Sequence, residues 1–312
     1  MSDIQVPVLS LARLEADAAE REHLAAACRE WGFFLLTEHG VSEEAQQRFM
    51  FETKRFFACP SDEKRKITRT AENPWGFYDQ ELTKNRRDWK EIFDFGRDQD
   101  HATWDSRSQW PELVGFREVM MDWFSTCEDL SRRLLSQVTL TLGDDSTLLT
   151  RHFAPVHSSF LRLNDYPVCD DPADGSLSRP AEGHLGISHH TDAGAVTVLF
   201  QDAVPGLQVE HDGRWFTIDP IPGAFIINIG DMVEVWSNGR YRAPLHRVLA
   251  NDSDERFSAP FFYNPAFDTN VAPITDEQAR FRTINWGEFR AARAAGDYAD
   301  EGQEIQIADF AC

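Results

Sequence analysis

Residues 188–217 read SHHTDAGAVTVLFQDAVPGLQVEHDGRWFT, and the pattern in this stretch decides the fold. The strand-forming runs AVTVLFQ, GLQVEH and RWFT follow one another closely, and the turn signal HDGR separates the last two. Similar runs stand upstream in SSFLRLNDY and downstream in AFIINIG, HRVLAN and RFSAPFFYN, with IPGA, SNGR and NDSD as turns. Short strands separated by such turns are typical of an antiparallel sandwich or barrel. We therefore predict a mainly β protein with flanking helices, built on a jelly-roll, or double-stranded β-helix, core.

The first half of the chain predicts helices instead. Residues 11–31 place leucines and alanines near one helical stripe, between the strand-like segments VPVLSL and GFFLLTEHG. Residues 41–58 read as a second helix with Ser42 as its N-cap. Residues 111–143 carry apolar side chains at helical spacing and predict a long helix that packs against the sheet.

One domain with four parts is the expected organisation, because a single β core with helical additions reaches a length of 312 residues. The expected parts are a mixed N-terminal region beside the substrate pocket (1–110), the long packing helix (111–150), the jelly-roll core (151–270) and a C-terminal helix and loop that could act as a lid (271–312).

Charge and composition exclude several classes of protein. A formal net charge of -21 disfavours binding to nucleic acid or to an anionic membrane, because both need clustered Lys and Arg. With 42% hydrophobic residues, the chain is too apolar to be disordered. Its five cysteines are scattered without a CxxC pair, and the first residues lack the features of a signal peptide. We expect a cytoplasmic protein, and the sequence gives no indication of its oligomeric state.

The HHTD motif at the start of the quoted stretch predicts a metal site. Residues two apart in a strand point to the same face, about 6.6 Å apart, so His190 and Asp192 could meet at one ion. His246 begins the run after the SNGR turn and could face them across a barrel mouth. Two histidines and a carboxylate form a facial triad, which leaves positions of an octahedral Fe(II) open. Taken singly, each residue also fits a polar turn or a packed strand end, and His189 points to the opposite face.

Arg256 and Ser258 predict an anion site. They are two residues apart and share a strand face, so the planar guanidinium could pair with a carboxylate while the hydroxyl donates a further hydrogen bond. The alternative is a surface arginine in the charged turn after DSDE. The residues that follow, SAPFFY, are typical of a core strand, and an arginine leading into a buried run needs a partner.

The segment NPWGFYDQELTKNRRDWKEIFDFGRD, residues 73–98, mixes aromatic and charged residues. Its aromatic rings and arginines could line a pocket for a small, partly apolar metabolite. Core packing of the rings and solvation of the arginines explain the same pattern equally well.

These motifs together resemble the isopenicillin N synthase-like branch of the Fe(II)- and 2-oxoglutarate-dependent oxygenases. The likeness covers nearly the whole chain, from VPVLSLARL, CREWGFFLLTEHGV and RFFACPSDEK to RLNDYP, HHTDAGAVTVLFQD, the GLQVEH to PLHRV segment and RFSAPFFYNP. The motifs stand in the family's order and at similar spacing. The resemblance implies a jelly-roll core and an oxidoreductase that acts on a small molecule of secondary metabolism.

For the metal centre, the resemblance implies that His190, Asp192 and His246 bind Fe(II). The implied cosubstrates are 2-oxoglutarate and O₂. The implied reaction is oxidation of the substrate, most often hydroxylation, with release of succinate and CO₂. It requires no catalytic protein acid or base beyond the metal ligands.

For the cosubstrate, the resemblance implies that Arg256 and Ser258, which match the family's Arg-x-Ser, bind the distal carboxylate of 2-oxoglutarate. Tyr166 and Asn164 match the Asn-x-Tyr-Pro element in RLNDYP. The tyrosine would help to hold that carboxylate, and the asparagine would lie near the cosubstrate.

Three alternatives stay open at this point. Isopenicillin N synthase and aminocyclopropane-carboxylate oxidase have the triad and an Arg-x-Ser but do not use 2-oxoglutarate. A zinc hydrolase could use the same three ligands, although it needs a general base and the chain has no HExxH motif. A jelly-roll binding protein without catalytic activity is the third alternative, because a fold alone does not fix activity.

Overall fold

The computed structural model describes residues 5–70, 72–83, 86–98, 107–180, 182–275, 277–295 and 305–312. The helices are α1 (Leu11–Ala16), α2 (Glu20–Glu30), α3 (Glu43–Phe57), α4 (Ser61–Arg65), α5 (Phe116–Thr141), α6 (Asp231–Trp236) and α7 (Trp286–Ala295), with short 3-10 helices at Thr150–Phe153 and Ile307–Phe310. The strands are β1 (Val8–Ser10), β2 (Phe33–Thr37), β3 (Gly76–Tyr78), β4 (Leu82–Thr83), β5 (Arg86–Arg87), β6 (Glu91–Gly96), β7 (Phe160–Tyr166), β8 (Leu185–His190), β9 (Val196–Gln201), β10 (Leu207–His211), β11 (Arg214–Thr217), β12 (Phe225–Ile229), β13 (His246–Leu249), β14 (Arg256–Tyr263), β15 (Asn270–Val271) and β16 (Ile284–Asn285).

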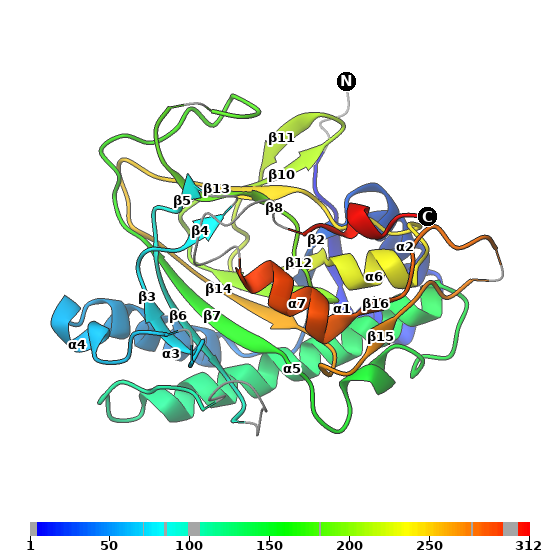
Figure 1. Cartoon of the computed structure of the whole chain (residues 1–312), viewed down its shortest axis with the longest axis horizontal. Helices are drawn as coiled ribbons and strands as arrows, with labels where there is room; N and C mark the ends of the chain where they lie inside the picture. Colours follow the sequence, from blue (N-terminus) through cyan, green and yellow to red (C-terminus); the bar gives the residue numbers. More distant parts are fainter. Residues whose placement is uncertain are drawn as a thin grey trace.

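Two β-sheets form the core of the protein. The larger has eight strands in the order β1-β2-β12-β9-β14-β7-β6-β3, and the smaller has four in the order β11-β10-β13-β8. The strands of the two sheets interleave along the chain, and the smaller sheet lies over one end of the larger one (Figure 1). This arrangement confirms the predicted jelly-roll and all seven strand-forming runs from which it was predicted.

Strand alternation divides the larger sheet into a packing face and a cavity face. On β9, Val196, Val198 and Phe200 belong to the main hydrophobic core, whereas Thr197 and Leu199 line a cavity. The other central strands, β7, β12 and β14, alternate in the same way. The register therefore places every second side chain of these strands in one cavity between the sheets.

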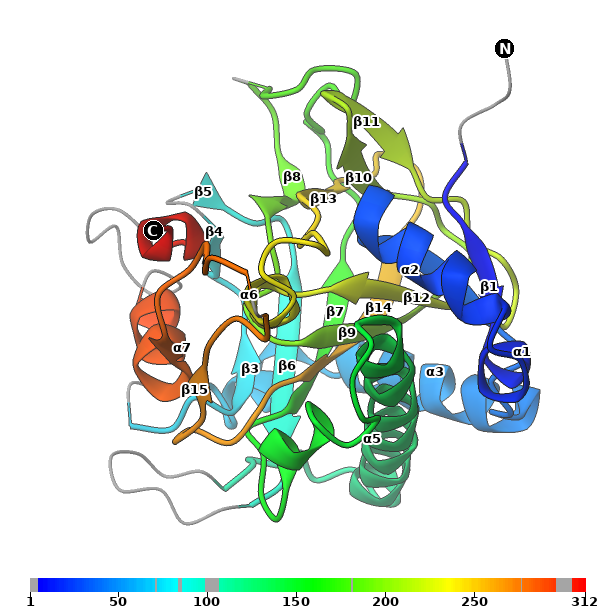
Figure 2. The ribbon, with the colours of Figure 1, turned by 90° about the vertical axis from the view of Figure 1, so that its right-hand side faces the viewer.

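Helices α3 and α5 cover the outer face of the larger sheet (Figure 2). As predicted, Ser42 caps α3, because its Oγ accepts a hydrogen bond from the backbone N–H of Ala45 at 3.2 Å. The predicted long helix is α5, which buries one side against the core. The single helix predicted over residues 11–31 is wrong: two helices, α1 and α2, form there. Between them Asp17 is extended, and its carboxylate accepts a hydrogen bond from Ala19 N–H at 2.8 Å.

The N-terminal third of the chain extends the larger sheet at both edges. Strands β1 and β2 add to the β12 side, and β6 and β3 add to the β7 side. The rings of Phe77, Phe93 and Phe95 pack in the main hydrophobic core, so core packing rather than pocket lining explains these aromatic residues of segment 73–98. Other residues of that segment, Glu81 and Lys90 among them, do line the cavity.

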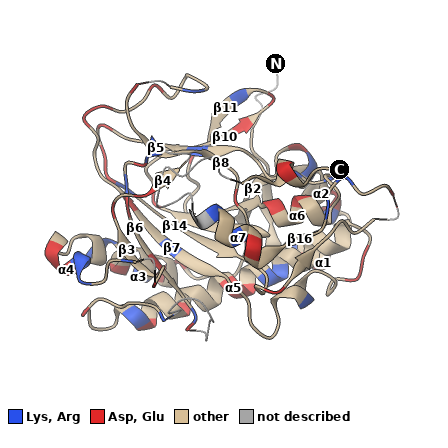
Figure 3. Cartoon of the chain, viewed as in Figure 1, with Lys and Arg blue, Asp and Glu red and all other residues tan. Residues whose placement is uncertain are grey.

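Basic residues do not gather on the side of the molecule seen in Figure 3, where Lys and Arg are interspersed with Asp and Glu over helices and loops. The longest helix, α5, spans Phe116–Thr141 and carries several charged residues. Over the described ranges, no helix combines the length and the apolar character that crossing a membrane requires.

The alternation on β7 also buries a carboxyl group, and this predicts a pH-dependent stability. Burial, reinforced by the carboxylates of Glu255 and Glu91, raises the pKa of Asp165 from 3.8 to about 8. At pH values between 3.8 and about 8, Asp165 therefore keeps its proton in the folded chain and loses it in the unfolded chain. This group therefore lowers the free energy of unfolding as pH rises, by at most about 1.4 kcal/mol per pH unit.

Asp165→Asn removes this ionisable group. We expect the free energy of unfolding of D165N, relative to the parent protein, to be higher at pH 8 than at pH 5. Urea unfolding at both pH values measures this difference. A difference that is the same at the two pH values would contradict the assignment of a buried, protonated carboxyl.

Candidate active site

A cavity of about 160 Å³ lies between the two sheets. Its walls come from the inner faces of both sheets, from the turn after β8 and from three side chains of α7, namely Trp286, Arg290 and Arg293. All seven site residues predicted from the sequence line this one cavity: His190, Asp192, His246, Arg256, Ser258, Tyr166 and Asn164.

Three of these residues form a group that could hold a metal ion. His190 ends β8 and His246 begins β13, where the two are paired in register, and Asp192 lies in the turn directly after β8. One ligand atom from each lies within 4.8 Å of the others. Asp192 Oδ1 is 3.6 Å from His190 Nε2 and 3.7 Å from His246 Nε2. Over the described ranges, no other group of three His, Cys, Asp or Glu side chains comes together in this way.

Backbone carbonyls orient both imidazoles. His190 Nδ1 lies 2.8 Å from the carbonyl oxygen of Ser188, and His246 Nδ1 lies 3.0 Å from that of Pro244. A proton donated from Nδ1 to a carbonyl leaves Nε2 with a free lone pair, as metal binding requires. Burial, followed by the neighbouring His246, lowers the pKa of His190 to about 3, which keeps its ring neutral.

Two polar side chains hold the carboxylate of Asp192. Thr197 Oγ1 and Asn228 Nδ2 donate hydrogen bonds to Oδ2, the latter at 2.8 Å, and Oδ1 is left facing the histidines. Burial raises the pKa of Asp192, but His246, His190 and these two hydrogen bonds outweigh it and leave the pKa below its usual value. Neither donor was predicted from the sequence. Each is a lone polar residue in an apolar strand run, and such a residue needs a partner.

Replacing Asn228 tests whether its hydrogen bond positions the carboxylate of Asp192. Asn228→Leu leaves Oδ2 of Asp192 with a single hydrogen bond, so we expect the dissociation constant for Fe(II) to rise about 10- to 100-fold. Anaerobic titration followed by tryptophan fluorescence measures it, with circular dichroism as the control for folding. A folded N228L variant with the parent's dissociation constant would show that Asn228 does not orient the ligand.

In the same cavity, Arg256 is a buried cation with unused donors. The residue is 1% exposed, and its NH2 group donates to Gln201 Oε1 at 2.6 Å. Among the residues that the structure describes, its Nε and NH1 have no hydrogen-bond partner, and neither have Gln201 Nε2 and Asn164 Oδ1. An unsatisfied buried donor costs about 1–3 kcal/mol, and more when charged. An anion bound here would remove that cost.

The remaining predicted residues lie beside Arg256. Tyr166 is its register partner on β7, and the guanidinium carbon is 5.0 Å from the centre of the tyrosine ring. Ser258 is the register partner of Asn164, whose Nδ2 donates to Ser258 Oγ at 3.3 Å. The structure thus brings together all four residues predicted to bind the cosubstrate, in the cavity that also contains the three-residue metal-binding group.

His189 does not line this cavity and is not part of the metal-binding group. Two other histidines make structural contacts: His39 Nε2 lies 2.8 Å from Gly223 O, and His157 Nε2 lies 2.6 Å from Glu128 Oε1.

Comparison with known families agrees with this site. Residues 157–265 match the model of the 2OG-Fe(II) oxygenase superfamily, and residues 6–113 match that of the "non-haem dioxygenase in morphine synthesis N-terminal" region. Gibberellin 2-beta-dioxygenase 8 of Arabidopsis thaliana is 31% identical, with 93% of this chain and 82% of that protein aligned. 2-Oxoglutarate-dependent dioxygenase 19 of Oryza sativa subsp. japonica is 33% identical, with 97% and 87% aligned.

Solved structures agree with this result. The crystal structure of JOX2 in complex with 2OG, Fe, and JA superimposes with a TM-score of 0.79 at 29% identity and covers 92% of this chain and 84% of JOX2. The dioxygenase for auxin oxidation from rice shares the fold, with a TM-score of 0.74 at 24% identity, over 99% of this chain and 100% of the rice protein. The protein is a non-haem oxidoreductase that uses Fe(II), 2-oxoglutarate and O₂. The chain belongs to the 2-oxoglutarate- and Fe(II)-dependent oxygenases.

Proposed function

We propose that His190, Asp192 and His246 hold the Fe(II) of a dioxygenase that oxidises a small molecule, and that Arg256 anchors 2-oxoglutarate beside it. One observation carries the second assignment: Arg256 is buried at the wall of the same cavity with two donor nitrogens that no described residue satisfies. The 2-oxo acid has a distal carboxylate that could accept from both. In this proposal Ser258 and Tyr166 support that carboxylate, and Asn164 lies beside the cosubstrate.

When bound, the iron and 2-oxoglutarate supply the oxidising power with O₂, and the products include succinate and CO₂. The chain's residues bind and orient. The triad would offer two imidazole nitrogens and one carboxylate oxygen to the ion. Thr197 and Asn228 hold the carboxylate in position. No acid or base from the protein is required.

The substrate would bind at the end of the cavity opposite Arg256. Phe160 and Tyr166 lie at the two ends of β7, about 20 Å apart. Because Arg256 contacts the ring of Tyr166, Phe160 marks the end of the cavity that is far from Arg256. The rings of Phe160 and Phe262 stack with centroids 4.7 Å apart, and Thr197, which holds the metal-binding carboxylate, is the register partner of Phe262. This aromatic wall suits a small molecule with an apolar body. Hydroxylation is the outcome that we propose.

Conversion of 2-oxoglutarate to succinate tests the proposed function. With Fe(II) and O₂, we expect slow succinate formation by the protein alone and faster formation when a panel of small organic metabolites contains a substrate. Replacement of Fe(II) by Zn(II) should stop it. Succinate formation independent of Fe(II), or its absence with Fe(II), would contradict the proposal.

We propose that the chain has four parts with boundaries near residues 110, 150 and 270, and that the protein is cytoplasmic and does not bind nucleic acid. The proposed lid, residues 271–312, lies partly outside the described residues. Helix α7 supports a lid in this place, because Trp286, Arg290 and Arg293 line the cavity.

A further inference from the structure

Six charged side chains form a cluster near the metal-binding group: the buried residues Arg69, Glu81, Asp88, Lys90 and Asp94, and the largely buried Arg162. Lys90 Nζ lies 2.7 Å from Glu81 Oε2 and 3.1 Å from Asp88 Oδ2. Arg162 donates to both oxygens of Asp94 at 2.7 Å and to Glu81 at 2.7 Å. Three cations thus balance three carboxylates. Burial alone would lower the pKa of Lys90, but Glu81 and Asp88 outweigh it and raise that pKa to about 12.

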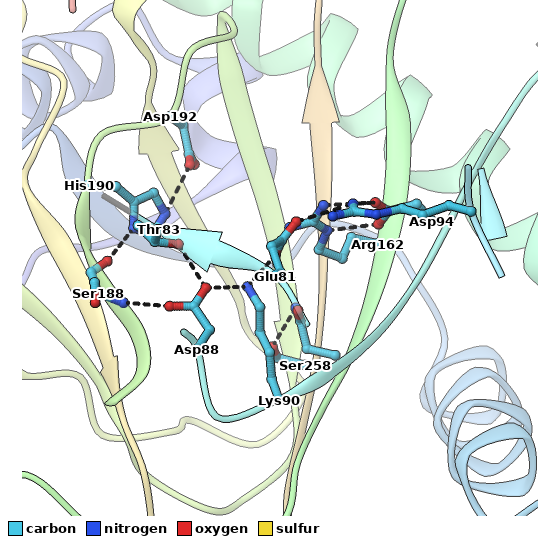
Figure 4. A network of polar contacts seen from close by, with 12 residues as sticks. Glu81, Thr83, Asp88, Lys90, Asp94, Arg162, Ser188, His190, Asp192 and Ser258 are labelled. Atoms are coloured by element: carbon cyan, nitrogen blue, oxygen red, sulfur yellow. Dashed lines mark hydrogen bonds and ion pairs between the residues drawn. The ribbon is translucent and has the colours of Figure 1, made fainter. Parts of the chain in front are cut away.

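Such a cluster needs an explanation other than stability. Desolvation offsets most of the attraction within buried ion pairs, and apolar residues of similar volume are often as stable or more stable. We therefore infer that the cluster holds a neighbouring segment of the chain in place. Figure 4 shows that it is connected through Asp88 to the strand that carries His190.

The connection has two steps. Asp88 Oδ2 is fixed by Thr83 Oγ1 at 2.7 Å and by Lys90, while Oδ1 accepts a hydrogen bond from the backbone N–H of Ser188 at 3.1 Å. The carbonyl oxygen of Ser188 in turn lies 2.8 Å from Nδ1 of His190 (Figure 4). Asp88 thereby holds Ser188, which follows it by one hundred residues in the chain. The carbonyl of Ser188 in turn orients the imidazole of His190.

The local strand pairing explains why this support is needed. Among the described strands, β8 is an edge strand whose only partner in its sheet is β13. His246 pairs with His190 and Val248 pairs with Ile187, so Ser188 and His189 together oppose the single residue Arg247. A bulge of this kind disrupts the ladder and re-aims a side chain. Asp88 binds the strand at the bulge, and Trp89 N–H donates to Leu185 O at 2.9 Å on the same edge.

We propose that Asp88 is a positioning residue for the metal site: it fixes Ser188 at the bulge of β8, so that the Ser188 carbonyl holds His190 with Nε2 toward the ion. The inference rests on the proposed function, since it takes His190 to be a ligand. It gives the N-terminal region a part in metal binding in addition to its contribution to the larger sheet.

Two paired variants isolate the hydrogen bond from the charge. D88A/K90M removes one carboxylate and one cation together, so the cluster stays neutral, and it lacks an acceptor for Ser188 N–H. D88N/K90M has the same charge but retains an amide oxygen in place of Oδ1. We expect the dissociation constant for Fe(II) to rise about tenfold in D88A/K90M and to remain within about threefold of the parent in D88N/K90M.

The measurement is an anaerobic Fe(II) titration, and circular dichroism and the melting temperature of the metal-free proteins report folding. Asp94→Asn, at the far end of the cluster, is the control for general damage and should leave the dissociation constant within about threefold of the parent value.

Equal dissociation constants for the two paired variants would overturn the inference, as would an equal loss of affinity in D94N. Should D88A/K90M fail to fold, the single variant Asp88→Ser decides in its place: its shorter side chain does not reach Ser188, and parent-like affinity would overturn the inference. A parent protein that does not bind Fe(II) would instead refute the proposed function.

Discussion

His190→Ala is expected to abolish conversion of 2-oxoglutarate to succinate. The loss should exceed the approximately 100-fold effect of removing a residue that only hydrogen-bonds to a metal ligand. The variant removes one of the three ligand atoms that we propose share a single ion, and the neighbouring His189, which lies outside the cavity, cannot replace it. Succinate formation at saturating Fe(II) and 2-oxoglutarate measures the effect. The Fe(II) dissociation constant of the same variant should rise as well.

His189→Ala is the matched control, because it changes the same residue type one position earlier. This side chain does not line the cavity and is not part of the metal-binding group, so we expect activity within a few-fold of the parent. An H190A variant that remains active, or an H189A variant that loses as much, would show that the wrong histidine has been assigned.

Arg256→Leu is expected to produce the second large effect, on the cosubstrate. Truncating one partner of a buried, hydrogen-bonded charge pair costs about 2–5 kcal/mol, which corresponds to a rise of roughly 30- to several-thousand-fold in the apparent KM for 2-oxoglutarate. The affinity for Fe(II) alone should change little, since Arg256 does not contact the metal-binding group. Steady-state kinetics at varied 2-oxoglutarate, together with a separate Fe(II) titration, measure both quantities.

Arg256→Lys separates charge from geometry. Lysine retains the positive charge but lacks the planar fork that pairs with a carboxylate through two hydrogen bonds. Its KM for 2-oxoglutarate should therefore lie between those of the parent and R256L. A KM that does not change in R256L would place the carboxylate elsewhere in the cavity.

Much of the site could be predicted from the sequence because it follows strand alternation. Residues two apart on a strand share a face, so Arg256 and Ser258 had to point the same way. Asn164 and Tyr166 were predicted from the resemblance to the oxygenase family, and Asp192 lies after the end of β8 rather than on the strand. What the sequence does not contain is the register between strands. The structure pairs Arg256 with Tyr166 and Ser258 with Asn164, and this pairing brings two separate motifs into one slot.

The residues that escaped prediction depend on contacts between distant segments. Asn228 and Asp192 are thirty-six residues apart, and Asp88 and Ser188 are one hundred apart, so no local pattern relates them. The break between α1 and α2 was missed for a different reason. Asp17 can satisfy the N–H of Ala19 with its own side chain, and this local competition ends a helix that apolar spacing alone would continue.

The two halves of the chain share one cavity. The jelly-roll contributes His190, Asp192 and His246 and the proposed anion-binding residue Arg256. The N-terminal region contributes Glu81 and Lys90 to the cavity wall and Asp88, which holds Ser188. Removal of the Asp88 acceptor is therefore expected to weaken metal binding even though Asp88 does not belong to the metal-binding group.

We propose that one chain binds one Fe(II) and one 2-oxoglutarate next to each other in this cavity. Anaerobic titration of the metal-free protein, followed by visible absorption, is the sharpest test, because a 2-oxo acid bound to Fe(II) gives a weak visible band. We expect a band that requires both components, saturates at one equivalent of each and is lost in H190A. A parent protein that shows no band, or a band that H190A retains, would contradict it.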